Sequence, residues 1–341
     1  MRPRVSYLRM FAMLVMVAAV SVLAHAQGGR GGGGRGGNAG PPPPKDVAAP
    51  AIPGVVAPGT RIELVEFPVQ GTEGPLRVLD GSGILWTERN VSHIAKIDLN
   101  GNHSTFVESA EGANGLAWDS KGRLLAVLRP ASGEKVAVLY PPAAVTTLAD
   151  KVDGKPFNAL NDLIVSTKDD IYFTDTQGIY FLRPGGQVKK VLDLKNMNGV
   201  VLSADEKTLY ANHKDGEYVL AFDVQPDGSL KNQRNFGKYK SVTTPGAADP
   251  RLAEDNGADG MAIDDAGRIY TATNVGVEVF SPKGEYLGAI PIGLWGAEQN
   301  RIQKPQNLTF AGPDRKWLYT VGSNAIYRVQ LLAAGIKSRG K

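Results

Sequence analysis

The sequence predicts an all-β fold built from repeated four-stranded sheets, and three observations support this prediction. DGMAIDDAGRIYTAT, at residues 259–273, places alternating apolar residues on both sides of an Asp/Gly turn, the pattern of an antiparallel hairpin. The chain carries six copies of this pattern, which begin at Glu73, Asn114, Asn161, Asn198, Asp259 and Gln306. Their spacings of 41, 47, 37, 61 and 47 residues leave room for four short strands per repeat. Such repeats bury both sheet faces only by stacking around an axis, so six copies predict a six-bladed β-propeller.

The first 26 residues are expected to be a signal peptide. Three arginines precede an apolar run at residues 10–23, and Ala24-His25-Ala26 offers a cleavage site. The apolar run is short for a transmembrane helix, so no stable membrane insertion is expected after cleavage, an uncleaved anchor being the alternative. The protein is therefore expected to be exported, either to the periplasm or to the medium.

Composition excludes several classes of function. The formal net charge of +4 falls to +1 when the leader arginines are removed, so no nucleic-acid partner is expected. Cysteine is absent, which excludes disulfides, thiolate metal sites and cysteine nucleophiles.

The segments that flank the repeats are expected to play different parts. Residues 27–60 are rich in Gly, Pro and Ala and are expected to be a disordered tether, and residues 336–341 a basic tail. The propeller is expected to span residues 61–335. Its last repeat ends with a third strand at residues 325–331, and no fourth strand follows. Because a propeller must close its ring or leave a sheet edge bare, residues 61–69 are predicted to supply the outermost strand of the last blade.

The repeats also predict where a functional site would lie. If each first strand lines the axis, the polar residues that open the repeats converge at one end of it. The ends of the second strands form a wider ring around them, and the long links 149–160, 237–258 and 292–305 fall on the same face. The expected substrate-binding residues at this end are Asn114, Asn161, Arg129, Asp175, His213 and Trp295.

The converging residues are expected to hold a divalent cation. Glu73 and Asp259 supply two carboxylates, which repel each other unless a cation lies between them. Asn161 and Asn198 add neutral oxygens, and an all-oxygen set favours Ca²⁺, with Mg²⁺ and Mn²⁺ as alternatives. Zn²⁺ ranks last, because His213 is the one histidine near the ring. A metal that only holds the blades together is one outcome, and a metal that assists hydrolysis is the other.

Four of these stretches resemble a known family. EGP at Glu73, NDLIVSTKDDIYFTD at Asn161, NGVVLSADEKTLY at Asn198 and DGMAIDDAGRIYTAT at Asp259 are similar to motifs of the regucalcin (senescence marker protein)/gluconolactonase family. The resemblance covers about residues 62–330 and implies a six-bladed propeller that hydrolyses sugar lactones with a divalent metal. It places Glu73, Asn198 and Asp259 on the metal ligands, Asn161 on a metal or substrate contact, and Asp259 on the proposed general base.

Two further functions stay open from the sequence. The same site is compatible with a hydrolase of phosphotriesters or other esters. A non-catalytic propeller that binds a small ligand or a partner on its rim, with a structural metal, is the alternative of a different class.

Overall fold

The computed structural model describes residues 46–241, 257–292, 304–322 and 324–337. Within these residues nearly all regular structure is β, apart from one short 3-10 helix, η1 (Pro142–Ala144). No helix in the described ranges is long and apolar enough to cross a membrane. The predicted signal peptide, residues 1–26, lies outside them.

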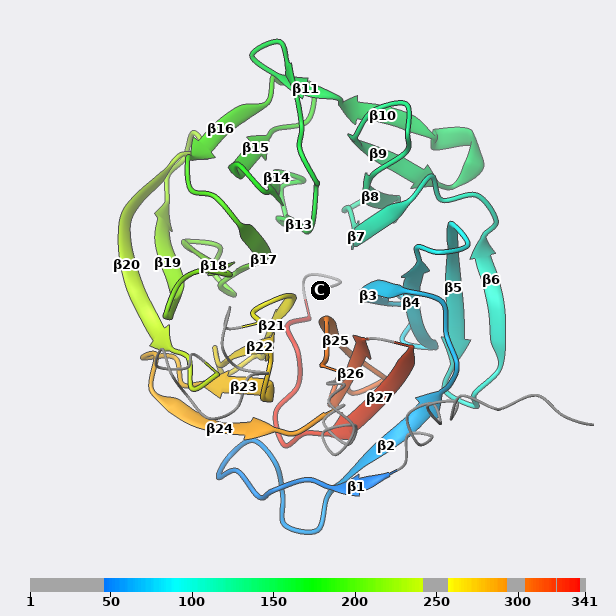
Figure 1. Ribbon diagram of the computed structural model, residues 1–341, viewed down its shortest axis with the longest axis vertical. Coiled ribbons are helices and arrows are strands. Elements are labelled where there is room, and N and C mark those ends of the chain that lie inside the picture. Colours follow the sequence, from blue (N-terminus) through cyan, green and yellow to red (C-terminus); the bar gives the residue numbers. More distant parts are fainter. Residues whose placement is uncertain (1–45, 242–256, 293–303, 323, 338–341) are drawn as a thin grey trace, which may run out of the picture. The chain divides into compact units, whose positions relative to one another are not determined.

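Six antiparallel sheets surround a common axis, and the first strand of each repeat is the innermost (Figure 1). The predicted six-bladed β-propeller is therefore confirmed. Blade 1 contains β3 (Thr72–Arg77), β4 (Gly83–Glu88), β5 (His93–Asp98) and β6 (His103–Val107). Blade 2 contains β7 (Ala113–Trp118), β8 (Leu124–Leu128), β9 (Lys135–Tyr140) and β10 (Thr146–Ala149). Blade 3 contains β13 (Leu163–Val165), β14 (Ile171–Asp175), β15 (Gly178–Leu182) and β16 (Lys189–Leu192).

The remaining blades follow the same order along the chain. Blade 4 contains β17 (Met197–Leu202), β18 (Thr208–His213), β19 (Tyr218–Val224) and β20 (Leu230–Lys238). Blade 5 contains β21 (Met261–Ile263), β22 (Ile269–Thr273), β23 (Gly276–Phe280) and β24 (Tyr286–Ile290). Blade 6 contains β25 (Asn307–Ala311), β26 (Trp317–Gly322) and β27 (Ala325–Gln330). A small hairpin of β11 (Lys151–Val152) and β12 (Lys155–Pro156) links blades 2 and 3.

The core lies between neighbouring blades because each sheet is covered on both faces. On β13, Leu163 and Val165 pack with residues of blade 2, whereas Ile164 packs with residues of blade 4. Alternate side chains of one strand thus enter two different interfaces, and the strand is apolar throughout. Each fully buried aliphatic side chain contributes about 1.5–3 kcal/mol to folding.

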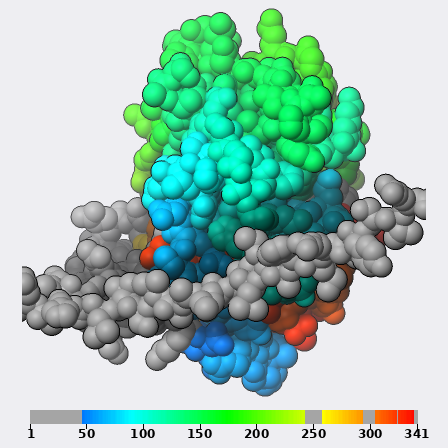
Figure 2. Space-filling view, turned by 90° about the vertical axis from the view of Figure 1, so that its right-hand side faces the viewer, coloured from blue at the N-terminus to red at the C-terminus, as the bar shows by residue number. Residues whose placement is uncertain are grey.

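The N-terminal strand closes the ring as predicted. β2 (Arg61–Glu66) pairs antiparallel with β27, with Ile62 opposite Val329 and Leu64 opposite Tyr327. Blade 6 is therefore completed by a strand from the other end of the sequence. Figure 2 shows this arrangement from the side: the N-terminal strands (blue) lie at one end, blades 1 and 2 (cyan) follow, and later blades (green) lie at the other end.

Residues 46–60 differ from the expected disordered tether. β1 (Val47–Ala48) pairs with β2 and adds a fifth strand to blade 6. Ile52, Val55 and Val56 are buried against blades 5 and 6. The prediction missed this short apolar stretch because residues 27–60 as a whole are rich in Gly, Pro and Ala. The stretch buries enough apolar surface to be ordered.

The C-terminal segment also extends beyond the predicted boundary of the propeller. Asp265 donates a backbone hydrogen bond to the Ala334 carbonyl at 2.8 Å, and Gly335 donates one to the Arg315 carbonyl at 2.8 Å. Ile336, predicted to begin a basic tail, is buried among residues of blades 4 and 5. The Arg77 guanidinium donates to the Lys337 carbonyl at 2.8 Å. Residues 334–337 thus connect the hairpin turns of blades 5 and 6 to blade 1, at the end of the axis where the first strands finish.

Truncations should separate the two parts of the N-terminal segment. A mature chain that starts at residue 46 should unfold at the same denaturant midpoint as one that starts at residue 27. A chain that starts at residue 59 loses the contacts of Ile52, Val55 and Val56, and its free energy of unfolding should fall by several kcal/mol. Equal midpoints for all three chains in urea melts would contradict the packing of residues 46–58.

Candidate metal centre

Five of the six residues that open the repeats gather at one end of the axis. Glu73, Asn114 and Asn198 lie on the innermost strands β3, β7 and β17, and all three are buried. Asn161 precedes β13, and its carbonyl and side-chain oxygens both accept hydrogen bonds from the Asn114 amide, at 2.8 and 3.2 Å. Asp259 precedes β21 and is 6% exposed. The predicted convergence of polar groups is therefore present in the fold.

Backbone hydrogen bonds between neighbouring blades hold these residues in place. Gly115 donates to the Asn161 carbonyl at 3.0 Å, Gly199 to the Asp259 carbonyl at 3.1 Å, and Gly260 to the Gln306 carbonyl at 2.7 Å. A Cβ atom on Gly199 would lie 2.3 Å from the Asp259 carbonyl oxygen. Glycine follows the polar residue in these repeats because the next blade approaches too closely for a side chain.

Side chains of the second strands also bind backbone carbonyl groups of site residues. Thr87 Oγ1 donates to the Asn114 carbonyl at 3.2 Å, and Thr174 Oγ1 donates to the Asn198 carbonyl at 2.6 Å. Asn212 Nδ2 donates to the Asp259 carbonyl at 2.5 Å. All three donors are fully buried, and each belongs to the blade that precedes the residue it holds. The backbone of each site residue is thus fixed from the neighbouring blade.

The two predicted carboxylates are buried and unfavourably charged. Burial raises the pKa of Glu73, and the charge of Asp162 raises it further. Burial, followed by the charge of Glu73, raises the pKa of Asp259 to about 8. Lys214, Lys304 and the Asn198 amide act in the opposite direction on Asp259. Without a cation, Asp259 therefore holds a proton at neutral pH.

Amide groups around these carboxylates have unfilled hydrogen-bonding capacity. Neither Oδ1 nor Nδ2 of Asn198 meets the geometry of a hydrogen bond with any described residue, although its amide is near enough to Asp259 to lower that pKa. Asn114 Oδ1 is likewise buried and has no such partner in the described chain. A buried polar atom that lacks a partner costs free energy, so these groups indicate a ligand.

The donor set fits a hard divalent cation. Among the described residues no cluster of three or more His, Cys, Asp or Glu side chains could hold a metal by itself. Two carboxylates with amide oxygens instead match the oxygen ligands of Ca²⁺. A cation between Glu73 and Asp259 would offset the burial and the neighbouring negative charge that raise both pKa values.

The predicted substrate-binding residues have different environments. Arg129 follows β8, and its guanidinium donates hydrogen bonds to the carbonyls of Leu160 and Ala159. Glu73 and Asp259 both act on its pKa, which places Arg129 beside the centre. His213 ends β18 and is half-buried. Trp295 lies outside the described residues.

The Asp175 carboxylate accepts hydrogen bonds from neighbouring protein groups. Its carboxylate accepts from the backbone N–H groups of Asn158, Gln177 and Gly178 and from the Tyr180 hydroxyl. The side chain is 1% exposed. These bonds hold the β14–β15 turn and leave little capacity for a substrate.

Several residues of the centre escaped prediction. Asn307 Nδ2 donates to Glu73 Oε2 at 3.3 Å, so the inward polar residue of blade 6 lies one position after the predicted Gln306. Asp162 lies one position after Asn161, and its charge raises the pKa of Glu73. Arg89 lies one position after β4 and lowers the pKa of Glu73. The alternation of each strand could have located these neighbours, but only once the register was known.

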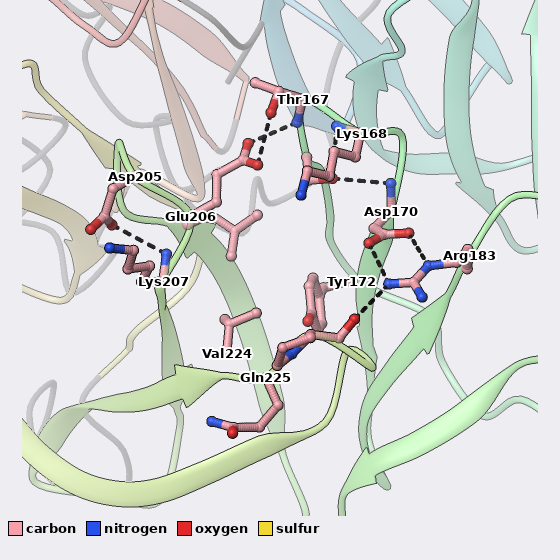
Figure 3. Close-up of a pocket in the computed structure, with 13 residues that line it drawn as sticks. Thr167, Lys168, Asp170, Tyr172, Arg183, Asp205, Glu206, Lys207, Val224 and Gln225 are labelled. Atoms are coloured by element: carbon pink, nitrogen blue, oxygen red, sulfur yellow. Dashed lines mark hydrogen bonds and ion pairs between the residues drawn. The ribbon is translucent and has the colours of Figure 1, made fainter.

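A groove at the other end of the blades lacks these features. It has a volume of about 580 Å³ and lies between blades 3 and 4. Arg183 forms an ion pair with Asp170 there, at 2.9 and 3.0 Å, and the Glu206 carboxylate accepts from the N–H and hydroxyl of Thr167 at 2.7 and 2.9 Å (Figure 3). We therefore assign the candidate site to the axial residues rather than to the groove.

Substitution of Thr174 tests how the centre is held. Thr174→Val removes the donor to the buried Asn198 carbonyl and should lower the free energy of unfolding by about 1–3 kcal/mol. It should also weaken Ca²⁺ binding, because the Asn198 backbone is no longer fixed. Thr174→Ser keeps the hydroxyl and is the matched control, expected to retain Ca²⁺ affinity. Calorimetric titration measures both variants, and equal affinities would remove the proposed link between the second strand and the site.

Known proteins resemble this chain over most of its length. Residues 71–324 match the SMP-30/Gluconolactonase/LRE-like region. A gluconolactonase from Zymomonas mobilis is 24% identical, over 84% of this chain and 86% of that protein. The structure of a gluconolactonase from Xanthomonas campestris has a TM-score of 0.69 and 22% identity, covering 84% of this chain and 95% of that one. The calcium-binding protein regucalcin from Agrobacterium tumefaciens has a TM-score of 0.61 and 15% identity, covering 79% and 93% of the two chains. The predicted resemblance is thus confirmed, and this chain belongs to the SMP-30/gluconolactonase/LRE-like family.

Proposed function

We propose that this protein is an exported hydrolase that opens lactone rings with the help of a divalent cation. The observation that carries the proposal is the pair of buried carboxylates, Glu73 and Asp259, together with the buried side-chain oxygens of Asn114 and Asn198, which accept no hydrogen bond from a described residue. Membership of the family and similarity to the gluconolactonases of Zymomonas mobilis and Xanthomonas campestris support a lactone as the substrate.

Glu73, Asn198 and Asp259 would hold the cation, with Asn161 close by. Their oxygen atoms favour Ca²⁺ over Mg²⁺, Mn²⁺ and Zn²⁺, and the similarity to a calcium-binding regucalcin supports the same ion. When bound, a divalent cation polarises the lactone carbonyl and stabilises the negative charge that develops on its oxygen. It also favours the ionised form of Asp259, which is the form that accepts a proton.

Asp259 is the proposed general base. The oxygen of a water molecule bonds to the acyl carbon, and the ring C–O bond breaks. The Asp259 carboxylate takes one proton from this water and returns it to the leaving ring oxygen, so that the product is a hydroxy acid. Asn161 is tied to Asn114 at 2.8 Å and has no usable basicity, so its role is to orient the substrate or the cation.

Export of the protein belongs to the same proposal. Residues 1–26 carry the basic, apolar and small-residue parts of a signal peptide, and the chain has no cysteine. N-terminal sequencing of the protein from fractionated cells should find a mature chain that begins at Gln27.

Asp259→Asn should separate base catalysis from cation binding. The amide keeps an oxygen of similar size but cannot accept the proton, so kcat should fall by about two to four orders of magnitude at saturating Ca²⁺. Asn161→Asp adds charge, so it should keep or improve Ca²⁺ affinity and lower kcat less. The assay is acid release from a panel of lactones in a pH-stat. A near-normal kcat for Asp259→Asn would place the base elsewhere, and no acid release from any lactone would favour a non-catalytic propeller.

The stability of the cation-free protein should depend on pH in a defined direction. In the unfolded chain Asp259 ionises near its ordinary pKa of 3.8, whereas in the folded protein it keeps its proton up to about pH 8. The folded state therefore binds the extra proton between these values, and the free energy of unfolding falls as pH rises through this window. One such group changes it by at most about 1.4 kcal/mol per pH unit.

Thermal melts of chelator-treated protein between pH 5 and pH 8 test this dependence. Tm should decrease with rising pH, and excess Ca²⁺ should raise Tm most at the upper end, where cation and proton no longer compete. Asp259→Asn is the control and should remove most of the slope. A Tm of the chelated wild type that rises across this range would contradict the buried, protonated state of Asp259.

A further inference from the structure

Three blades place a cation at the same position beside the centre. Arg89, Arg129 and Lys214 are each the first residue after the second strand of blades 1, 2 and 4. Their backbone N–H groups donate to the carbonyls of Gly71 (3.1 Å), Gly112 (3.3 Å) and Asn196 (3.1 Å). Each of these acceptors lies two residues before a residue of the centre, namely Glu73, Asn114 or Asn198. The three side chains therefore leave the backbone from equivalent points around the axis, at the end that holds the carboxylates.

A fourth cation joins them from the segment before blade 6. Lys304 Nζ donates to the Gly257 carbonyl at 3.1 Å, and Gly257 lies two residues before Asp259. The equivalent residue in blade 3 is the neutral Thr176, whose backbone N–H donates to the Asn158 carbonyl. We call Arg89, Arg129, Lys214 and Lys304 the cationic rim.

The rim residues are close to the centre and two of them are close to each other. The charge of Arg89 lowers the pKa of Glu73, and the charges of Lys214 and Lys304 lower the pKa of Asp259. In each case the charged form of the carboxylate is favoured. Burial and then the charge of Arg89 lower the pKa of Arg129. Two guanidinium groups thus lie within electrostatic reach of one another.

The described residues offer the rim little compensation beyond the centre itself. No ion pair between described residues involves any of the four rim side chains. Among the described residues Glu134 is the one carboxylate outside the centre whose charge raises the pKa of Arg129, and it also accepts the backbone N–H of Leu160 at 2.6 Å. With a divalent cation bound, the four rim charges and the two of the cation outnumber the four carboxylates Glu73, Glu134, Asp162 and Asp259. Like charges held together raise the free energy of the site unless an anion joins them.

Arg129 is preorganised to bind such an anion. Its Nε and Nη2 atoms donate to the carbonyls of Leu160 and Ala159, which fixes the guanidinium plane and leaves Nη1 for a ligand. Arginine recognises carboxylate and phosphate oxygens through this planar donor set. A neutral sugar lactone presents only hydroxyl groups. Four positively charged side chains would favour a ligand with a negative charge over such a neutral one.

We propose that the physiological substrate is an anionic lactone, which carries a carboxylate or phosphate group in addition to the lactone ring. The cationic rim binds this group while the ring carbonyl reaches the axial centre. The inference rests on the proposed lactone hydrolysis and adds the substrate class.

Matched lactones test the charge preference. Acid release is measured at saturating Ca²⁺ for glucono-δ-lactone, its phosphorylated form and a glucaric acid lactone, which carries a carboxylate. At least one anionic lactone should have a kcat/KM about tenfold above that of the neutral lactone, which corresponds to about 1.4 kcal/mol. The advantage should shrink as salt increases, since the rim is partly exposed. Which anionic lactone is preferred distinguishes phosphate from carboxylate, and an equal or higher kcat/KM for the neutral lactone overturns the proposal.

Substitution of Arg89 tests whether the cationic rim causes the preference for anionic lactones. Arg89 is exposed, and Arg89→Gln should reduce the ratio of kcat/KM for the anionic and neutral lactones by about tenfold. Lys121→Gln is the charge-matched control, because Lys121 is an exposed residue of the β7–β8 turn at the other end of the axis. It should leave the ratio unchanged. An unchanged ratio in Arg89→Gln overturns the assignment.

Binding without turnover separates this inference from the proposed function. Glucose, glucuronate and glucose phosphate share one ring and differ in charge, and calorimetry measures their affinity for the Ca²⁺-loaded protein. Tighter binding of an anionic sugar, lost in Arg89→Gln, supports an anion site even if no lactone is hydrolysed. Equal affinity for all three sugars overturns the anion site even if lactones are hydrolysed.

Discussion

The hydrogen bonds between neighbouring blades at the axis are the interaction on which this structure depends. A carbonyl group of one inner strand accepts from the glycine N–H of the previous blade, as in the pair of Gly199 and Asp259 at 3.1 Å. The Asp259 carbonyl also accepts from Asn212. These bonds fix the spacing of the blades where the side chains of the centre meet. The geometry of the site is therefore a property of the closed ring rather than of any single blade.

The close approach of the inner strands also determines the electrostatics of the site. Burial, together with the neighbouring negative charge, raises the free energy of the ionised forms of Glu73 and Asp259. The strands that carry them cannot move apart without breaking the bonds between blades. The proposed cation would relieve this repulsion, so a fold stabilised by apolar interfaces could bind a hard ion at its axis.

The sequence allowed the blades to be predicted well because their signal is local. Alternation around Asp/Gly turns reports strand pairing, and the missing fourth strand of the last repeat pointed to β2, which does pair with β27. The opening residues of the repeats located Glu73, Asn198 and Asp259 for the same reason. Contacts between blades were harder to predict, since they depend on register. Asn307 lies inward where Gln306 was expected, and Thr174 and Asn212 hold carbonyl groups of residues that are distant in sequence. The roles of residues 46–60 and 334–337 also depend on surfaces that form only when the ring closes.

The placement of residues 334–337 has a consequence for how this protein comes apart. Gly335 is bonded to Arg315 of blade 6 and faces Asp264 of blade 5, and Leu332 donates to the Val55 carbonyl at 2.9 Å. Both ends of the described chain are thus anchored where the ring closes, and each end supports the other. Opening at this junction must break the β2–β27 pairing and the C-terminal contacts together, so neither end of the part of the chain that the structure describes can detach alone. We expect such an arrangement to slow unfolding, which would lengthen the lifetime of the folded state in the presence of proteases.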